Sequence, residues 1–154
     1  MDRAAFQEQI LKWTRDNIAP IASEATYSEN VSYPDENVSY YDTYTVCYFP
    51  VNENGEKTDW VQIGEDTVDG KVHYVDITMI DEAKWLSTVE KAMELLAAGE
   101  GVSAADSGLD EFRLAYVSGQ LEEEGSYWES PLFDAYFYRY DDGAPSITIY
   151  KMAP

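Results

Sequence analysis

The residues with catalytic potential in this sequence are few, and their spacing does not favour chemistry. His73 is the only histidine, and Asp76 follows it three residues later. On one regular strand this odd spacing places the two side chains on opposite faces, so they do not form a catalytic dyad. A lone histidine on a strand is typically structural, and we expect no catalytic role for His73.

Cys47 is the only cysteine, so no disulfide can form within the chain. A reactive thiolate needs positive charge nearby, and no Lys or Arg occurs between Arg15 and Lys57. The sequence therefore predicts that Cys47 is an inert, buried thiol.

No pattern in the sequence indicates a metal or a cofactor. Glu122, Glu123 and Glu124 are consecutive, whereas a calcium loop spaces its ligands at alternate positions, so this run is typical of a solvated charged segment. A phosphate-binding loop, a dinucleotide fingerprint and a spaced Cys/His set are all missing from the sequence. We expect no catalytic residues, no metal and no cofactor, and an enzyme is unsupported.

The net charge narrows the choice of partner. Thirty Asp and Glu oppose ten Lys and Arg, a net charge of −20, whereas a small domain usually carries a charge of magnitude about 2–8. Such a field repels nucleic-acid phosphates and anionic membranes, and it attracts basic proteins. The alternative is that the acidity serves only solubility.

Length and composition predict one domain over residues 1–154, with enough apolar residues for a core. The N-terminal segment has mixed charges rather than a basic region followed by an apolar run, and the chain lacks an apolar stretch of membrane-spanning length. We expect an intracellular, cytoplasmic protein.

Periodicity predicts a helix and then a three-stranded meander. Helical spacing of apolar residues runs from Asp2, the expected N-cap, to Ile18, and an irregular loop is expected over 20–36. Period-two alternation begins after Asn37, and turn signals at 54–55 and 69–70 divide residues 37–80 into three antiparallel strands.

The second half repeats this order of helix and strands. Asp81 is the expected N-cap of a helix whose stripe consists of Trp85, Leu86, Val89, Ala92, Met93 and Leu96. A short turn is expected at 103–106. The pattern over 111–117 fits either a helix or a strand, and alternation of Phe112, Leu114 and Tyr116 favours the strand. Residues 133–141 and 146–152 are expected to form a hairpin.

Strands joined by short turns, with helices in separate blocks, predict an α+β fold. We expect a mostly antiparallel sheet, made of the meander and the C-terminal hairpin, with the N-terminal and central helices packed on one face. In element order alone the chain resembles the cystatin and NTF2 folds and several small bacterial immunity-protein folds, and no sequence motif assigns it to any of these families.

Acidic residues and tyrosines gather in two blocks that lack Lys and Arg, residues 16–56 and 114–138. Tyrosine provides large contact area at low entropic cost and is enriched at interfaces. The first block contains the pentapeptide Glu-Asn-Val-Ser-Tyr twice. We predict a partner-binding site made of Tyr33, Asp35, Glu36, Tyr40, Glu122, Glu123 and Glu124.

Two functional hypotheses follow. The first is an acidic inhibitor or binding protein that occludes a basic, nucleic-acid-handling partner such as a nuclease, in the manner of immunity proteins, anti-CRISPR proteins or DNA mimics. The second is a small pocket domain, either a ligand-binding protein or an enzyme, in which a curved sheet, the helices, His73 and Asp76 enclose a ligand.

Overall fold

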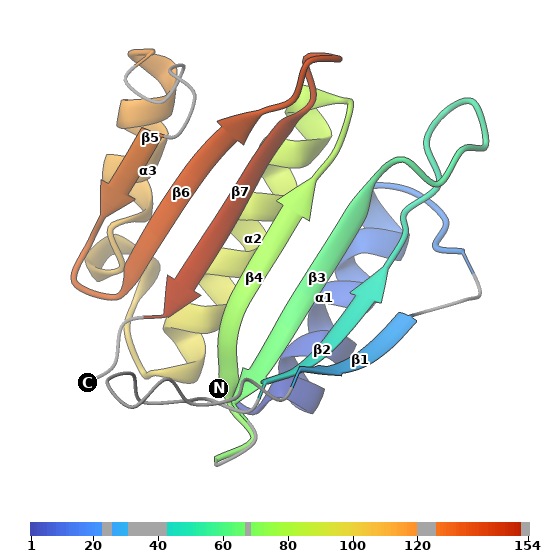
Figure 1. Ribbon diagram of the computed structural model, residues 1–154. Coiled ribbons are helices and arrows are strands. Elements are labelled where there is room, and N and C mark those ends of the chain that lie inside the picture. The colour runs from blue at the N-terminus through green and yellow to red at the C-terminus, as the bar shows by residue number, and fades with distance from the viewer. Residues whose placement is uncertain (23–25, 31–42, 67–68, 120–125, 152–154) are drawn as a thin grey trace, which may run out of the picture.

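Alternating apolar residues build one sheet of seven antiparallel strands in the computed structural model of the chain (Figure 1). The structure describes residues 1–22, 26–30, 43–66, 69–119 and 126–151. The strands lie in the order β1-β2-β3-β4-β7-β6-β5. The predicted α+β class and antiparallel sheet are therefore confirmed.

The predicted meander forms half of this sheet. It consists of β2 (Thr43–Tyr48), β3 (Trp60–Asp66) and β4 (Val72–Thr78). Gly55 and Gly70 adopt φ of 76° and 72° at the two connections, the conformation that the turn signals require. The meander gains a fourth strand, because β1 (Thr26–Asn30) pairs with β2 inside the segment expected to be a loop.

The C-terminal hairpin forms the other half. β6 (Phe133–Arg139) pairs with β7 (Pro145–Lys151), as predicted, and the short β5 (Ser126–Glu129) lies at the far edge. β7 also pairs with β4, with Ile149 opposite Val75. This pairing joins the meander and the hairpin into one sheet.

Two helices begin where the sequence predicts. α1 (Arg3–Asn17) is capped by Asp2, whose carboxylate accepts a hydrogen bond from the Ala5 N–H. α2 (Glu82–Gly99) is capped in the same way by Asp81, which accepts from the Lys84 N–H. Each cap satisfies a backbone donor that has no partner within its own helix.

The prediction of a strand over 111–117 is wrong, because α3 (Leu109–Val117) occupies this segment. Leu109, Phe112 and Ala115 are buried at a spacing of three residues, which is a helical period, while Leu114 is 71% exposed. The short 3₁₀ helix η1 (Ala104–Asp106) precedes it at the expected turn.

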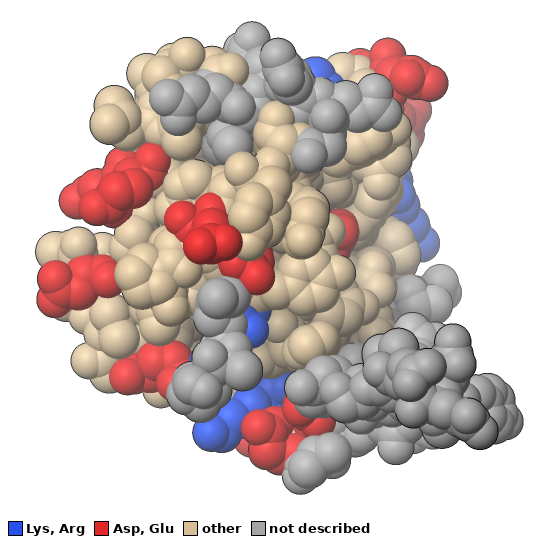
Figure 2. Space-filling model, turned by 60° about the vertical axis from the view of Figure 1, so that its left-hand side comes forward, with Lys and Arg blue, Asp and Glu red and all other residues tan. Residues whose placement is uncertain are grey.

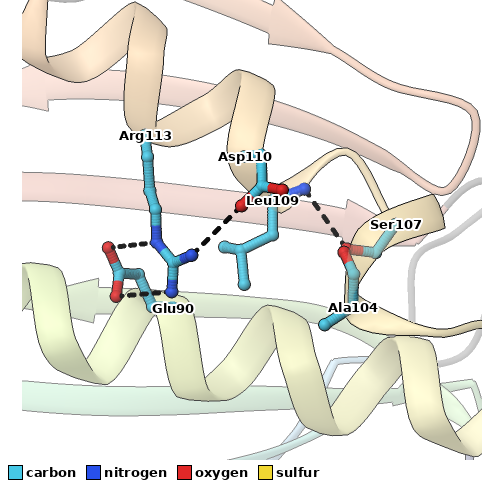
Figure 3. A network of polar contacts seen from close by, with 6 residues as sticks. All are labelled: Glu90, Ala104, Ser107, Leu109, Asp110 and Arg113. Carbon is cyan, nitrogen blue, oxygen red and sulfur yellow. Dashed lines mark hydrogen bonds and ion pairs between the residues drawn. The ribbon is translucent and has the colours of Figure 1, made fainter.

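A polar network fixes η1 and α3 to α2 (Figure 3). The Arg113 guanidinium binds both oxygens of Glu90 on α2, at 2.9 and 3.1 Å, and also Asp110, at 3.2 Å. The Ser107 hydroxyl donates to the Ala104 carbonyl and accepts from the Leu109 N–H. These contacts stabilise the start of the helix that the alternating pattern obscured.

All three helices lie behind the sheet in the view of Figure 1. Phe6 of α1, Trp85 of α2 and Phe112 of α3 are fully buried against it, and the Trp85 indole N–H donates to the Ile77 carbonyl of β4. The core therefore fills the space between the helices and one face of the sheet, and none of the helices in the described part of the chain lies on the opposite face.

Candidate functional site

The helix-free face of the sheet, here called the open face, is defined by strand register. Val46, Ile63, Val75 and Ile149 occupy one row of paired positions toward the helices. Because successive side chains alternate, the outward positions of the described residues are Thr45, Cys47, Trp60, Gln62, Gly64, Asp66, Tyr74, Asp76, Thr78, Tyr127, Glu129, Asp134, Tyr136, Tyr138, Ser146, Thr148 and Tyr150.

Four tyrosines on the open face form a continuous row of rings across β5, β6, β7 and β4. The ring centroids are 5.0 Å apart for Tyr127 and Tyr136, 6.0 Å for Tyr136 and Tyr150, and 5.9 Å for Tyr150 and Tyr74. Tyr127 and Tyr136 are 46% and 50% exposed. The row is thus a rigid aromatic surface in contact with water, of the kind enriched at protein interfaces.

Gly64 of β3 provides the space into which the Tyr74 ring, at one end of the tyrosine row, extends. The Tyr74 ring lies directly over Gly64, where an added Cβ would be only 2.0 Å from ring carbon Cε1. The Tyr74 hydroxyl accepts a hydrogen bond from the Gln62 amide at 2.9 Å and lies 3.2 Å from the Thr45 hydroxyl. The missing side chain at position 64 therefore makes room for the ring, and its two neighbours hold the hydroxyl.

His73 belongs to this aromatic surface, which corrects the expectation that it faces away from Asp76. A β-bulge shifts the register between Gly64 and Glu65, so that Glu65 pairs with Val72 and Gly64 with Tyr74. The imidazole thereby packs against Tyr74 and Tyr150, with centroids 6.1 and 5.9 Å away. The three-residue spacing of His73 and Asp76 gave the wrong faces for their side chains, because a bulge interrupts the strict alternation of side chains along a strand.

Asp76 is held at the centre of the open face by two donors. Its carboxylate accepts from the Trp60 indole N–H at 2.8 Å and from the Thr148 hydroxyl at 2.7 Å. Burial, together with the Asp76 charge, raises the pKa of the nearby Cys47 thiol to about 11. The thiol is therefore protonated at neutral pH, as expected of an inert cysteine, but Cys47 is half-buried rather than buried as predicted.

Tyr127 lies between two carboxylates at the β5 edge. Its hydroxyl is 2.7 Å from Asp134 and 2.8 Å from Glu129, and these contacts raise the pKa of Tyr127 above its ordinary value, with Asp134 the larger cause. A hydroxyl carries one proton and donates it to one acceptor at a time. One of the two carboxylates can therefore accept a further donor from outside.

The ion pairs of the described Lys and Arg, by contrast, lie on the helix side, whereas Lys57 lies in the loop before β3, at one edge of the open face. Arg113 and Arg139 bind Glu90 and Glu82 of α2. Further ion pairs join Arg3 to Glu65, Lys12 to Asp16, Lys84 to Glu53, Lys91 to Glu94 and Lys151 to Glu100. None of the outward strand positions that the structure describes holds Lys or Arg.

The space-filling view agrees with this distribution. Figure 2 brings the β5 side of the molecule forward, and red carboxylates there clearly outnumber blue cationic groups around a broad tan area. Among the residues that the structure describes, the ion pairs formed by Lys and Arg do not include Glu129, Asp134 or Asp76.

The residues predicted for partner binding, Tyr33, Asp35, Glu36, Tyr40, Glu122, Glu123 and Glu124, all lie outside the described residues. Their sequence neighbours Tyr127, Glu129, Asp134, Tyr136 and Tyr138, from the second acidic and tyrosine-rich block, do meet on the open face. Sequence reasoning missed Tyr74, Tyr150 and Trp60 as parts of this surface. Their alternation with buried residues was the signal that could have placed them outward.

Among the described residues, no three His, Cys, Asp or Glu side chains converge as metal ligands would. In the same part of the chain, none of the helices is long and apolar enough to cross a bilayer. No protein-family model matches the chain, and no curated protein or solved structure is significantly similar to it.

Proposed function

We propose that this protein is an acidic inhibitor or binding protein that occludes a basic, nucleic-acid-handling protein, and that the open face is its contact surface. The observation that supports this function is the separation of charge between the two sides of the sheet. Ion pairs neutralise acids on the helix side, whereas Glu129, Asp134 and Asp76 share the open face with tyrosines, and no described outward strand position holds Lys or Arg. Lys57, in the loop before β3, lies at one edge of this face.

Occlusion would work by substitution of carboxylates for phosphates. A nucleic-acid-binding surface presents Lys and Arg side chains that neutralise phosphates, and carboxylates at the β5 edge can engage the same groups. The tyrosine row adds contact area that loses little entropy on binding, since its rings already pack on one another. Glu122, Glu123 and Glu124 immediately precede β5 in the sequence, and we propose that they contact the same basic partner.

The pocket-domain hypothesis has less support. The space between the helices and the sheet is occupied by side chains such as Trp85, Phe6 and Met93, each with no exposed surface. Trp60 and Asp76, which could orient a ligand, meet on the open face instead. A surface that binds another protein therefore fits the arrangement better than an enclosed ligand site.

The test is capture of partners on the immobilised protein at low and at high salt, with mass spectrometric identification of what elutes. We expect a basic protein that is retained at low salt and released at high salt. The recovered protein is then mixed with labelled duplex DNA or RNA, and addition of the acidic protein should displace the nucleic acid.

Matched variants locate the contact. Glu129→Gln with Asp134→Asn removes two charges from the open face, and Glu8→Gln with Glu111→Gln removes two from exposed positions on α1 and α3. The first pair should weaken binding several-fold and the second pair much less. Reversal of Glu122, Glu123 and Glu124 to Lys should weaken it further, in a salt-sensitive manner. Equal effects of the two pairs, or a captured protein that still binds nucleic acid, would contradict the proposal.

A further inference from the structure

A hollow lies where the open face meets the loop before β3 and the turn after β6. It is lined by Phe49, Trp60, Thr78, Tyr140, Asp141 and Asp142. The two loops come from opposite halves of the sheet, and the pairing of β4 with β7 brings them together. The hollow is thus aromatic on its walls and acidic at its rim.

Small and large residues lie side by side at the hollow. Thr78 of β4 pairs with Ser146 of β7, and their hydroxyls form a hydrogen bond of 2.7 Å. Both residues are small and buried, at 2% and 5% exposure. Larger rings stand on either side, since Trp60 pairs with Thr78 and Tyr138 pairs with Ser146. Of these four residues, Trp60 and Thr78 line the hollow.

The rings of the walls are held in place. The Trp60 indole N–H donates to Asp76, which fixes the orientation of the ring. Tyr140 meets Trp60 edge to face, with centroids 5.9 Å apart, and packs on Tyr138 at 4.9 Å. The walls therefore hold two aromatic rings in a fixed arrangement, and the face of such a ring attracts cations.

The rim carries two exposed carboxylates. Asp142 accepts a hydrogen bond from the Ala144 N–H at 2.9 Å, so its side chain is oriented by the turn, and Asp141 precedes it. Lys57 also lines the hollow and is the chain's own cation there. Lys57 would compete with any cation from outside.

We propose that this hollow seats an arginine side chain of the basic protein partner, an inference that rests on the proposed function. A planar guanidinium can stack on Trp60 or Tyr140 while its N–H groups donate to the carboxylates of Asp141 and Asp142. A lysine ammonium is a compact, strongly hydrated charge that stacks less well. The hollow would thus distinguish arginine from lysine, whereas the acidic face as a whole attracts both.

The experiment titrates the intact protein with tri-arginine and tri-lysine peptides, capped at both ends, at low salt. Binding is followed by the indole N–H resonance of Trp60, assigned from the spectrum of Trp60→Phe. We expect tri-arginine to shift this resonance with an affinity about two- to fivefold higher than that of tri-lysine, the factor expected of an exposed cation–π contact. Lys57→Gln should raise the affinity for tri-arginine.

Asp141→Asn with Asp142→Asn keeps the side-chain oxygen that accepts from Ala144 and removes both charges, so the turn is retained. This pair should lower the affinity for tri-arginine more than the control pair Glu8→Gln with Glu111→Gln does. If tri-arginine shifts the resonances of the tyrosine row and leaves that of Trp60 unchanged, the proposed arginine site in the hollow is contradicted. The proposal that the open face is the contact surface is then retained. If neither peptide moves any resonance of the open face, the proposed function falls as well.

Discussion

Arg139 joins the hairpin that carries part of the open face to the helical layer. Its guanidinium binds Glu82, in the first turn of α2, at 2.6 Å and donates to the Gly143 carbonyl in the turn after β6 at 2.9 Å. The hydrogen bond from Arg139 is the main cause that lowers the pKa of Glu82, and a second one from Tyr116 adds to it. One ion pair therefore helps to fix the turn beside the hollow.

This lowered pKa predicts how the stability changes with pH. A carboxyl whose pKa is lower in the folded state stabilises the fold at pH values above its unfolded pKa, about 4.3, and that stabilisation is lost as the pH falls through the folded pKa. We expect Glu82→Gln to lower the free energy of unfolding at pH 7 by less than about 1 kcal/mol, since the pair is partly exposed. The difference from the native protein should be smaller at pH 3 than at pH 7, because the stabilisation is lost as the pH falls from the unfolded pKa through the lower folded pKa.

Urea unfolding at both pH values measures this difference, with Glu8→Gln on the exposed face of α1 as the control. The control should change stability little at either pH. A difference for Glu82→Gln that persists unchanged at low pH would show that its cause is not the charge.

At the scale of elements, Gly108 determines how α3 begins. It has φ of 88°, and an added Cβ would lie 2.7 Å from the Ser130 Cβ and 3.4 Å from the Trp128 ring. Trp128 packs edge to face on Phe112, with centroids 5.4 Å apart. The start of α3 thus depends on a close approach to the segment between β5 and β6.

We expect Gly108→Ala to destabilise the protein more than Gly101→Ala. Both glycines have positive φ, which costs about 1–2 kcal/mol for an alanine, but a Cβ at Gly101 would meet nothing within 4 Å. The difference between the two variants in thermal or urea unfolding therefore isolates the collision with Ser130. Equal losses would mean that β5 and α3 move apart without cost.

The elements that the sequence predicts correctly are those with strong local signals. Asp2 and Asp81 cap helices with clear apolar stripes, and the glycine turns set the meander. The short strands β1 and β5 lie at the edges, where pairing through the backbone requires little apolar alternation. The α3 segment misled because Leu114, which is exposed, completed an apparent alternation with Phe112 and Tyr116.

The open face was predictable only in part, because some of its residues are brought together by strand pairing between distant parts of the sequence. Tyr136 and Tyr138 alternate along one strand beside acidic residues, so local pattern identified their block. Tyr74 and Tyr150 meet only because β4 pairs with β7, about half the chain away. Such long-range pairing depends on the packing of α2 across both strands, which no local pattern contains.

At the scale of the whole molecule, two kinds of electrostatic interaction oppose each other. Ion pairs on the helix side attract, and each exposed pair contributes less than about 1 kcal/mol. The remaining acids repel one another, because thirty carboxylates face only ten Lys and Arg. With twenty charges in excess, the repulsion should outweigh the attraction in the folded state, where the acids are closest together.

Salt should therefore stabilise this protein while it weakens its binding. Raising NaCl from about 0.1 M to 1 M shortens the screening length from about 10 Å to about 3 Å, which reduces repulsion across the open face more than contacts within ion pairs. We expect the melting temperature to rise by a few degrees over this range, and to rise less for Glu129→Gln with Asp134→Asn. A melting temperature that falls with salt would show that ion pairs on the helix side dominate the electrostatic energy. The same screening weakens attraction to a cationic partner. If binding is lost at a salt concentration that stabilises the fold, the loss is electrostatic and is not caused by unfolding.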